Sequence, residues 1–313
     1  MDNPKKQMIS GLIYVVILNY NHKDDLLETI GSFVKQDYNS IKIIVVDNGS
    51  TDDSIICLKR SFPDIEVILN GENLGWAAGN NIGVKHALSN KSDYILLANN
   101  DLFFEESIIV SSLVTSLLKY PDLKVIGPRQ NFYSDRSKNY NSGWNFFPES
   151  GKIYNSFRKN SPEKNSNISM VDNVSGSFML IKCDVFNEVG MIDENFFLYA
   201  EDTDFCLRIW ENGYKCGIDN DLTIYHKVSS TAGINSPLKR YYKSRNLFYL
   251  IRKHKDAIIE IEAFKIKLLR SSVLLFLKIL FRKEYMHKRL SLIKAHSLGI
   301  WHGFVLKRMG KYY

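Results

Sequence analysis

The feature that most constrains this chain is an alternation of short apolar runs and amphipathic stretches across its first 128 residues. The apolar runs predict buried strands at 12–19, 41–47, 65–69, 93–99 and 124–128. The stretches between them predict helices at 25–36, from about 51, at 75–89 and at 105–120. Because strands that are apolar on both faces alternate with helices, the pattern predicts an α/β fold whose parallel sheet is covered on both faces.

This periodicity is lost between about 129 and 170, where Asn, Ser, Lys and aromatic residues dominate. We interpret the stretch as a long loop or hairpin excursion, which in a compact domain is usually functional or mobile. Order returns with a strand leading into a short helix at 171–186, a helix at 202–213, and two short strands at 214–218 and 222–226. From 237 onward the sequence predicts amphipathic helix.

The net charge of +7 is unevenly distributed along the chain. Residues 237–313 hold 19 Lys and Arg against 4 Asp and Glu, whereas residues 1–236 hold 22 against 30. Within 264–283 the cations are interleaved with apolar side chains at helical spacing, which predicts a helix lying in an anionic membrane interface. A helix packed on the body with a solvated basic face would give the same pattern. No nucleic-acid partner is expected, because the chain carries no recognised nucleic-acid-binding motif.

Cysteine usage and hydropathy predict a cytoplasmic protein. The four cysteines are Cys57, Cys183, Cys206 and Cys216. They form neither a CxxC pair nor a dense framework, which disfavours a disulfide scaffold and a zinc ribbon. The N-terminus lacks the apolar core of a signal peptide. The apolar runs 12–18 and 271–281 are too short to span a bilayer, so we expect no segment that crosses a membrane unaided.

Polar residues follow three of the predicted strands. The three strand exits read Asn19-Tyr20-Asn21, Asp47-Asn48-Gly49-Ser50 and Asn99-Asn100-Asp101. Ordinary turn chemistry uses the same residue types, but ligands of open α/β sheets bind beyond the carboxyl ends of the strands. There Asp47 could accept a base N–H or a ribose hydroxyl, and Tyr20 could stack on a base. Asp101 is a candidate ligand for a hard divalent cation.

A second acidic cluster, Glu201, Asp202 and Asp204, opens the helix predicted at 202–213. Acids at a helix start commonly cap the helix and complement its dipole. Three acids within four positions also repel one another, which raises their pKa values or calls for a cation. His226 ends the last short strand, and it would become functional only beside a metal or a phosphate.

Taken in order, six segments resemble the family 2 glycosyltransferases, in the branch of rhamnosyl- and galactofuranosyl-transferases. The matching segments are 15–21 (VVILNYN), 45–54 (VVDNGSTDDS), 73–83 (NLGWAAGNNIG), 96–102 (LLANNDL), 174–215 and 224–233 (IYHKVSSTAG). The resemblance implies a GT-A fold with a Rossmann-like, mostly parallel mixed sheet. It implies a domain over 1–236, with a nucleotide-binding half at about 10–128 and an acceptor half at about 129–236. The basic amphipathic helices of 237–313 form a tail.

The resemblance also assigns the donor site. In the family template Tyr20 lies beside the donor base, and Asp47 contacts the base or the ribose. Asn73 and Asn99 line the nucleotide-sugar site. Asn19 and Asn100, which stand at the strand ends, are also predicted to bind the donor.

The metal and the catalytic base are assigned in the same way. The family's Asp-x-Asp metal motif reads Asn99-Asn100-Asp101 here, so only Asp101 remains as a carboxylate and weak or water-mediated binding of Mg²⁺ or Mn²⁺ is expected. His226 matches a histidine that helps to hold the metal and the diphosphate. Asp202 matches the catalytic base, with Glu201 beside it on the acceptor side. Trp144, in the polar excursion, is a candidate acceptor contact.

The resulting prediction is an inverting glycosyltransferase of bacterial surface polysaccharide synthesis. A dTDP- or UDP-linked donor is expected, with rhamnose as the first candidate sugar and a saccharide or lipid-linked saccharide as acceptor. An anionic membrane surface on the inner face of the cell membrane is the expected partner. Two alternatives are a sugar-1-phosphate nucleotidyltransferase, which usually has a Gly-rich basic loop that residues 19–25 lack, and a non-catalytic nucleotide-sugar-binding or membrane-associated scaffold.

Overall fold

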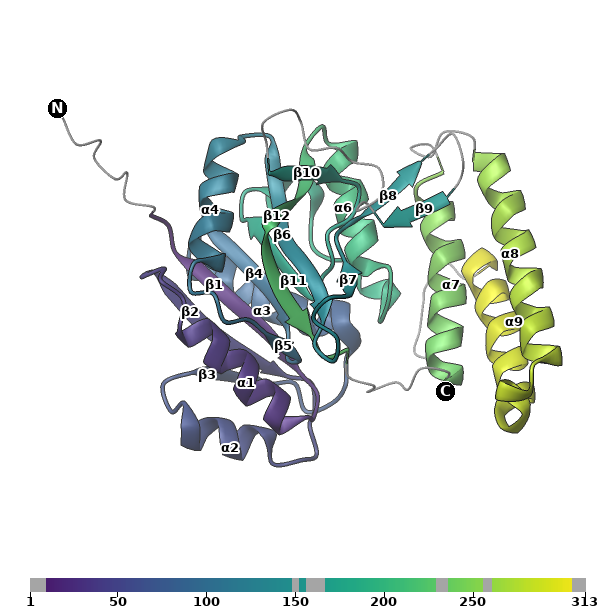
Figure 1. Cartoon of the computed structure of the whole chain (residues 1–313), viewed down its shortest axis with the longest axis horizontal. Coiled ribbons are helices and arrows are strands. Elements are labelled where there is room, and N and C mark those ends of the chain that lie inside the picture. The colour runs from purple at the N-terminus through teal and green to yellow at the C-terminus, as the bar shows by residue number, and fades with distance from the viewer. Residues whose placement is uncertain (1–9, 148–151, 156–166, 229–235, 256–260, 306–313) are drawn as a thin grey trace.

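A computed structural model describes residues 10–147, 152–155, 167–228, 236–255 and 261–305. Within these residues the chain forms one large mixed sheet flanked by helices, and a group of three helices stands beside it (Figure 1). The predicted mostly parallel α/β architecture with a helical extension is therefore confirmed.

The first part of the sheet is parallel, as its continuous apolar runs predict. Its strands are β1 (Ile13–Asn19), β2 (Ile41–Asp47), β3 (Glu66–Leu69) and β4 (Tyr94–Asn99), in the spatial order β3-β2-β1-β4. The helices between and after them are α1 (Lys23–Val34), α2 (Ser54–Ser61), α3 (Gly75–Ser89) and α4 (Ile109–Lys119).

Alternate residues of each strand enter two different cores, because successive side chains point to opposite faces of a sheet. Val15 of β1 packs in one core with Ile30 of α1, and Val16 packs in the other with Val84 of α3. All four side chains are fully buried. Both faces of the sheet are thus covered, and the carboxyl ends of the strands are left as the edge where a ligand can reach polar side chains.

The second part of the sheet mixes directions. Its strands are β5 (Leu102–Phe103), β6 (Leu123–Phe132), β7 (Asn139–Asn141), β10 (Ile168–Val171), β11 (Phe178–Lys182) and β12 (Lys215–His226). Strand β11 runs antiparallel to both β4 and β6, whereas β12 runs parallel to β6. Helices α5 (Val185–Val189), η2 (Glu194–Phe196) and α6 (Glu201–Glu211) lie between β11 and β12.

One expectation about local structure was wrong here, and another becomes more specific. The two short strands expected at 214–218 and 222–226 form one strand, β12, because its pairing with β6 resumes after a register shift between Asp219 and Thr223. The stretch from about 129, expected to be a long loop or hairpin excursion, contains a hairpin and further strands. Strand β6 continues to Phe132, β7 pairs with it, and β8 (Trp144–Phe147) and β9 (Lys152–Asn155) form a hairpin.

The tail consists of α7 (Pro237–Lys253), α8 (Ile261–Phe281), the short helix η3 (Lys283–Lys288) and α9 (Arg289–Val305). Two glycines let α9 approach α7 closely. A Cβ on Gly299 would lie 2.6 Å from the Tyr241 carbonyl oxygen, and one on Gly303 would lie 2.5 Å from that of Arg245. Of the helices that the structure describes, none combines the length and apolarity needed to cross a bilayer.

Candidate active site

The exits of β1, β2 and β4 are joined by side-chain hydrogen bonds. Asn19 donates through Nδ2 to Asp47 Oδ1 at 3.2 Å, and Asn100 Nδ2 donates to Asn19 Oδ1 at 2.8 Å. Ser50 donates its backbone N–H to Asp47 Oδ2 at 3.0 Å and its hydroxyl to Asp47 Oδ1 at 2.5 Å. Asp47 is 4% exposed, and its hydrogen bonds with Asn19 and Ser50 hold these strand ends in place. Tyr20, next to Asn19, is partly exposed.

Asn73 belongs to a neighbouring group of amides. Asn48 donates to Asn73 Oδ1 at 3.1 Å, and the same oxygen accepts the Gly75 N–H at 2.9 Å. These bonds fix the start of α3 against the end of β2. The predicted donor residues of β1, β2, β4 and the α3 entry therefore line one edge of the sheet.

Asp101 and His226 form a buried pair at the same edge. Their side chains are 7% and 6% exposed, and His226 Nε2 lies 2.9 Å from Asp101 Oδ1. The pairing of β12 with β5, in which His226 is opposite Leu102, brings these distant residues together. The other ring nitrogen, His226 Nδ1, has no hydrogen-bond partner within the described part of the chain.

Asp202 lies in the first turn of α6 and is partly exposed. Its Oδ2 accepts the Gly176 N–H at 3.0 Å, and its Oδ1 accepts the Thr203 N–H at 2.7 Å. Burial raises the pKa of Asp202 above its ordinary value, although the hydrogen bonds from Gly176 and Thr203 oppose the rise. The carboxylate is thus held in a fixed orientation and is a stronger base than an exposed aspartate.

Glu201 has a different environment. It is 6% exposed, and its Oε2 is buried with no hydrogen-bond partner among the described residues. Burial, and secondarily the charge of Asp202, raises the pKa of Glu201 well above its ordinary value. A carboxyl group in this state favours the neutral form, which makes Asp202 the better candidate for a base.

Trp76 connects the partner of Asp202 with a strand exit, and Tyr140 packs against the Asp101–His226 pair. Trp76 donates through Nε1 to Asn99 Oδ1 at 3.1 Å, and its ring lies so close to Gly176 that an added Cβ would be 2.6 Å away. Tyr140 of β7 packs edge-on against His226, with ring centroids 4.9 Å apart. Burial raises the pKa of Tyr140, and the nearby charges of Asp101 and Asp202 raise it further. Tyr140 therefore lies within electrostatic reach of both carboxylates.

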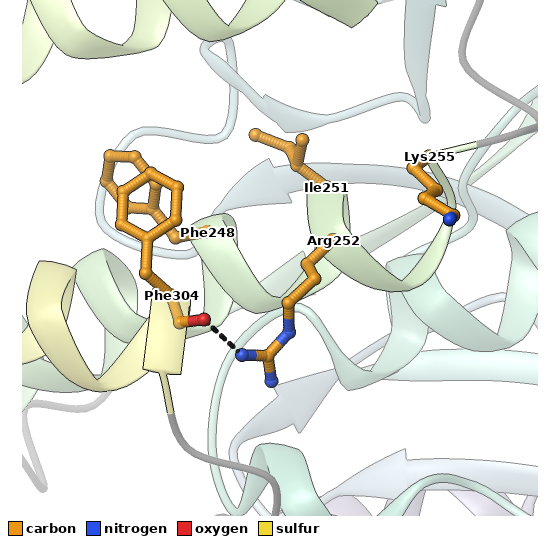
Figure 2. Close-up of a pocket in the computed structure, with 5 residues that line it drawn as sticks. All are labelled: Phe248, Ile251, Arg252, Lys255 and Phe304. Carbon is orange, nitrogen blue, oxygen red and sulfur yellow. Dashed lines mark hydrogen bonds between the residues drawn. The ribbon is translucent and has the colours of Figure 1, made fainter.

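Of two pockets in the structure, one lies at this edge of the sheet and the other lies within the tail. An open, polar pocket of about 810 Å³ lies beyond the ends of β1 and β2. It is lined by Asn21, His22, Lys23, Asp24, Asp25, Thr51, Asp52 and Asp53. A smaller apolar pocket of about 170 Å³ lies within the tail between α7 and α9, where Arg252 donates to the Phe304 carbonyl at 2.5 Å (Figure 2). Only the first pocket borders the predicted donor residues.

The segment just before Asp202 is shaped by α7. Asn246 donates through Nδ2 to the carbonyl oxygens of Phe196, Leu198 and Tyr199 at 2.8, 2.7 and 2.6 Å. Arg245, fully buried, donates to the Phe196 carbonyl at 2.7 Å. Phe197, Tyr199 and Ala200 have φ between 59° and 71°, a left-handed conformation that costs non-glycine residues free energy. The hydrogen bonds from Asn246 and Arg245 of α7 stabilise this conformation.

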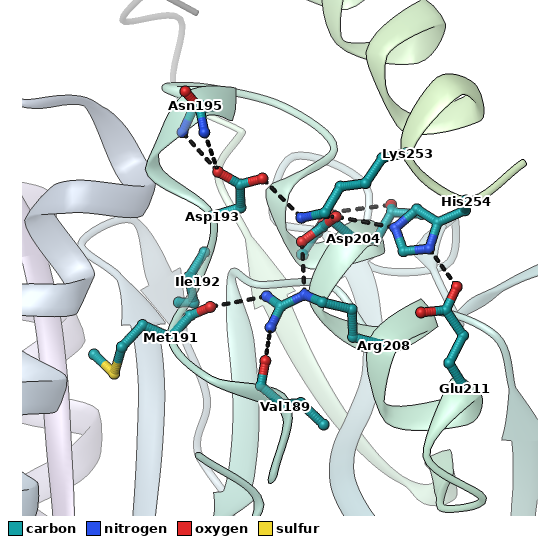
Figure 3. A network of polar contacts seen from close by, with 12 residues as sticks. Val189, Met191, Ile192, Asp193, Asn195, Asp204, Arg208, Glu211, Lys253 and His254 are labelled. Atoms are coloured by element: carbon teal, nitrogen blue, oxygen red, sulfur yellow. Dashed lines mark hydrogen bonds and ion pairs between the residues drawn. The ribbon is translucent and has the colours of Figure 1, made fainter. Parts of the chain in front are cut away.

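A charged network fixes α6 to the end of α7 (Figure 3). Asp204, fully buried, contacts Arg208 Nε at 3.0 Å, Lys253 Nζ at 2.7 Å and His254 Nε2 at 3.0 Å. Burial alone would raise the pKa of Asp204, but the hydrogen bond from His254 and the charge of Arg208 lower it overall. His254 also contacts Glu211 at 2.6 Å, and its two carboxylate partners raise its pKa against the effect of burial.

Sequence reasoning missed Tyr140, Gly176 and Asn246. Tyr140 lies in the polar excursion, where its aromatic character was the available signal, as it is for Trp144. Trp144 begins β8, and its side chain lies outside the described residues, so its predicted acceptor contact stays a prediction. Asn246 gave no signal, because its partners are backbone carbonyls about 50 positions earlier in the chain.

A mixed α/β sheet with acids and amides gathered at its carboxyl edge defines an enzyme-like ligand-binding fold. Two family models match this chain: "Glycosyl transferase family 2" over residues 14–190 and "Glycosyl transferase family group 2" over residues 115–306. The chain belongs to glycosyltransferase family 2, as the resemblance indicated. This membership favours the transferase over the nucleotidyltransferase alternative.

Two relatives and one solved structure illustrate the likeness. The dTDP-rhamnosyl transferase RfbF of Shigella flexneri is 28% identical over 279 residues, covering 84% of this chain and 88% of that protein. The N-acetylglucosaminyl-diphospho-decaprenol L-rhamnosyltransferase of Mycobacterium tuberculosis is 23% identical over 265 residues, covering 77% and 84%. The mannosyltransferase PcManGT of Pyrobaculum calidifontis, in complex with GDP-Man and Mn²⁺, matches with a TM-score of 0.59 at 16% identity, covering 93% and 87%. The last likeness shows the shared GT-A fold.

Replacing Asn246 tests the support of the segment before Asp202. Asn246→Ala should lower the free energy of unfolding by about 2–3 kcal/mol, because it removes the donor that buried backbone carbonyls use. Urea denaturation measures the change. Asn187→Ala, at an exposed position of α5, is the matched control and should change stability little. A loss in Asn246→Ala no larger than that of the control would contradict the supporting role.

The network around His254 predicts a pH-dependent contribution to stability. Because the folded-state pKa of His254 is raised, its stabilisation is complete below the unfolded-state pKa of about 6.5 and is lost as the pH rises through the folded-state value. His254→Gln should therefore be destabilised by about 2 kcal/mol at pH 6 and by less at pH 9. Urea denaturation at both pH values, with exposed His287→Gln as control, measures this. Equal losses at the two pH values would refute the charge assignment.

Proposed function

We propose that this protein is an inverting, metal-dependent glycosyltransferase that moves a sugar from a nucleoside-diphosphate donor to a saccharide or lipid-linked saccharide acceptor. Two observations carry the proposal: Asp101 and His226 form a buried pair at the carboxyl edge of the sheet, and Asp202 binds Gly176, which lies against Trp76 and so beside Asn99 at that edge. A leaving diphosphate needs charge neutralisation on one side of the anomeric carbon, and the acceptor hydroxyl needs a base on the other. The Asp101–His226 pair would serve the first need, and Asp202 would serve the second.

The donor would bind along the strand exits. Tyr20 would lie beside the base. Asp47 and Asn19 would support the contact with the base or the ribose. Asn73, Asn99 and Asn100 would line the path of the nucleotide sugar. The hydrogen bonds among these side chains support this role, because they hold the amides in place before a ligand arrives.

Asp202 would act as the base. In its ionised form it accepts the proton of the acceptor hydroxyl while that oxygen bonds to the anomeric carbon and the bond from that carbon to the diphosphate oxygen breaks. Its raised pKa supports this role, since a base is most effective when its pKa approaches the working pH. Glu201, beside it, would stay neutral and shape the acceptor side.

The donor set also fits a divalent cation. Within the described residues no three His, Cys, Asp or Glu side chains are grouped closely enough to hold a metal by themselves. Asp101 and His226 would supply two ligands, and diphosphate oxygens and water would complete a Mg²⁺ or Mn²⁺ site of the kind that uses few carboxylates. When bound, the cation would neutralise charge on the leaving diphosphate. The Mn²⁺ in PcManGT supports this proposal.

The names of the relatives support the finer identity of the substrates. The S. flexneri protein is a dTDP-rhamnosyl transferase, which supports a dTDP- or UDP-linked donor with rhamnose as the first candidate. The M. tuberculosis relative is named for a diphospho-decaprenol acceptor, which supports a lipid-linked saccharide and hence bacterial surface polysaccharide synthesis. Such an acceptor would place the protein in the cytoplasm, peripheral on the inner face of the cell membrane.

Asp202→Asn tests the base. The variant should lose about 10²–10⁴-fold in kcat/KM, because the amide cannot take the hydroxyl proton. Nucleotide release from dTDP-rhamnose in the presence of acceptor measures turnover, and the thermal shift given by dTDP should be unchanged. In the unmodified protein, activity should fall as the pH drops through a pKa above the ordinary aspartate value of about 3.9. Near-full activity of Asp202→Asn, with exposed Asp64→Asn as control, would exclude this role.

Asp101→Asn tests the cation site. The variant should bind dTDP or UDP as the unmodified protein does without metal, but should lose at least about tenfold of the affinity gained on adding Mn²⁺. Isothermal titration of each nucleotide with and without Mn²⁺ measures both quantities. Asp64→Asn, exposed between α2 and β3 and outside the polar pocket, is the matched control. If Mn²⁺ strengthened nucleotide binding equally in Asp101→Asn and the unmodified protein, the metal would have to bind elsewhere.

A further inference from the structure

Helix α8 forms the outer edge of the tail, on the far side of α7 and α9 from the sheet (Figure 1). Ile279 and Ser272 face inward and are buried. The Ser272 side chain lies 2.9 Å from His296 Nε2 of α9. On the opposite side of α8, the described side chains between Ile266 and Phe281 are exposed.

That face is mostly apolar, with Arg270 between Ile266 and Leu274. Its exposed residues are Ile266, Leu269, Val273, Leu274, Leu277 and Phe281, with exposed fractions between 41% and 73%. Positions 266, 269, 273, 277 and 281 follow the three- and four-residue spacing of one side of a helix. Contiguous apolar surface of this kind is uncommon on a monomer unless it binds something.

Exposed cations accompany this face. Arg270 and Lys278 lie on α8 itself, and Lys288 is exposed at the end of η3. The whole tail carries 19 Lys and Arg against 4 Asp and Glu. A partner for the face must therefore accept apolar side chains and positive charge together. A second copy of this tail would bring like charges together, whereas an anionic lipid surface offers both complements.

We infer that the exposed face of α8 lies flat on an anionic lipid bilayer, with Val273, Leu277 and Phe281 in the acyl boundary and Arg270 and Lys278 on the lipid head groups. A helix of 21 residues is about 31 Å long, which is enough for an extended contact in the plane of the interface. The inference deepens the proposed location of the protein but does not depend on the transferase chemistry, because no residue of the candidate active site belongs to this face.

Flotation of the full-length protein with vesicles tests the inference. The protein should float with vesicles of phosphatidylcholine and phosphatidylglycerol (7:3) in 0.1 M salt and should stay behind with phosphatidylcholine alone. The double variant Leu277→Gln/Phe281→Gln should reduce the partition coefficient at least tenfold. Arg270→Gln/Lys278→Gln should reduce it about fivefold per cation removed, since each contributes about 1 kcal/mol near an anionic surface.

Val34→Gln/Leu69→Gln, which changes two similarly exposed apolar residues of the body, is the matched control and should float normally. Failure of the unmodified protein to float, or normal flotation of Leu277→Gln/Phe281→Gln, would overturn the inference. A dimer in sedimentation equilibrium that only this variant abolishes, without vesicle binding, would assign the face to a second copy. All variants should keep the thermal shift given by dTDP, so failure of this inference is distinguishable from failure of the proposed function.

Discussion

The geometry of the acidic cluster depends on hydrogen bonds that α7 donates to the segment before α6. Asn246 and Arg245 bind carbonyl oxygens of residues 195–199, and these bonds hold three non-glycine residues in left-handed conformations. The same segment reaches the start of α3, where Trp76 donates its N–H to the Phe197 carbonyl at 2.6 Å. A helix of the basic tail thus determines where Asp202 stands relative to the strand exits. The boundary between a domain over 1–236 and a tail over 237–313 stays a prediction, and α7 contacts both sides of it.

Three acids within four positions of α6 have three different environments. Asp204 is neutralised by Arg208, Lys253 and His254, which lowers its pKa. Glu201 is buried, and its Oε2 has no hydrogen-bond partner among the residues that the structure describes, so burial raises its pKa. Asp202 lies between these extremes, with a raised pKa but with backbone N–H groups that hold its charge. Separate pKa values for neighbouring carboxyl groups allow one of them to take a proton while the others stay in fixed states.

The sequence predicted those parts of the fold that local pattern controls. Continuous apolar runs located β1, β2 and β4, and the Gly-rich entry located α3 at Gly75–Ser89. The single strand β12 was misjudged, because polar residues near Asp219 interrupt the apolar pattern whereas the pairing with β6 passes beyond them. Tertiary pairing decides such cases, and a local window does not contain it.

The residues of the candidate site also divide into those that local pattern predicts and those that only tertiary packing reveals. Residues at strand exits were identifiable, since the carboxyl ends of neighbouring parallel strands must meet. The contact between Asp101 and His226 could be proposed only from the family template, because the two residues are 125 positions apart. The roles of Tyr140 and Asn246 depend on packing between elements, which composition and periodicity do not specify. Their contribution became visible only from the contacts of the folded chain.

The short ladder between β5 and β12 has a consequence for how a charged ligand would be received. Asp101 and His226 adjoin main-chain positions that are already hydrogen-bonded across the sheet, so their spacing is inherited from the strands instead of from a hinged loop. Little conformational entropy is left for these two side chains to lose on complex formation. A ligand should therefore bind here with little change in the positions of Asp101 and His226. Any large rearrangement on ligand entry would have to come from other parts of the molecule.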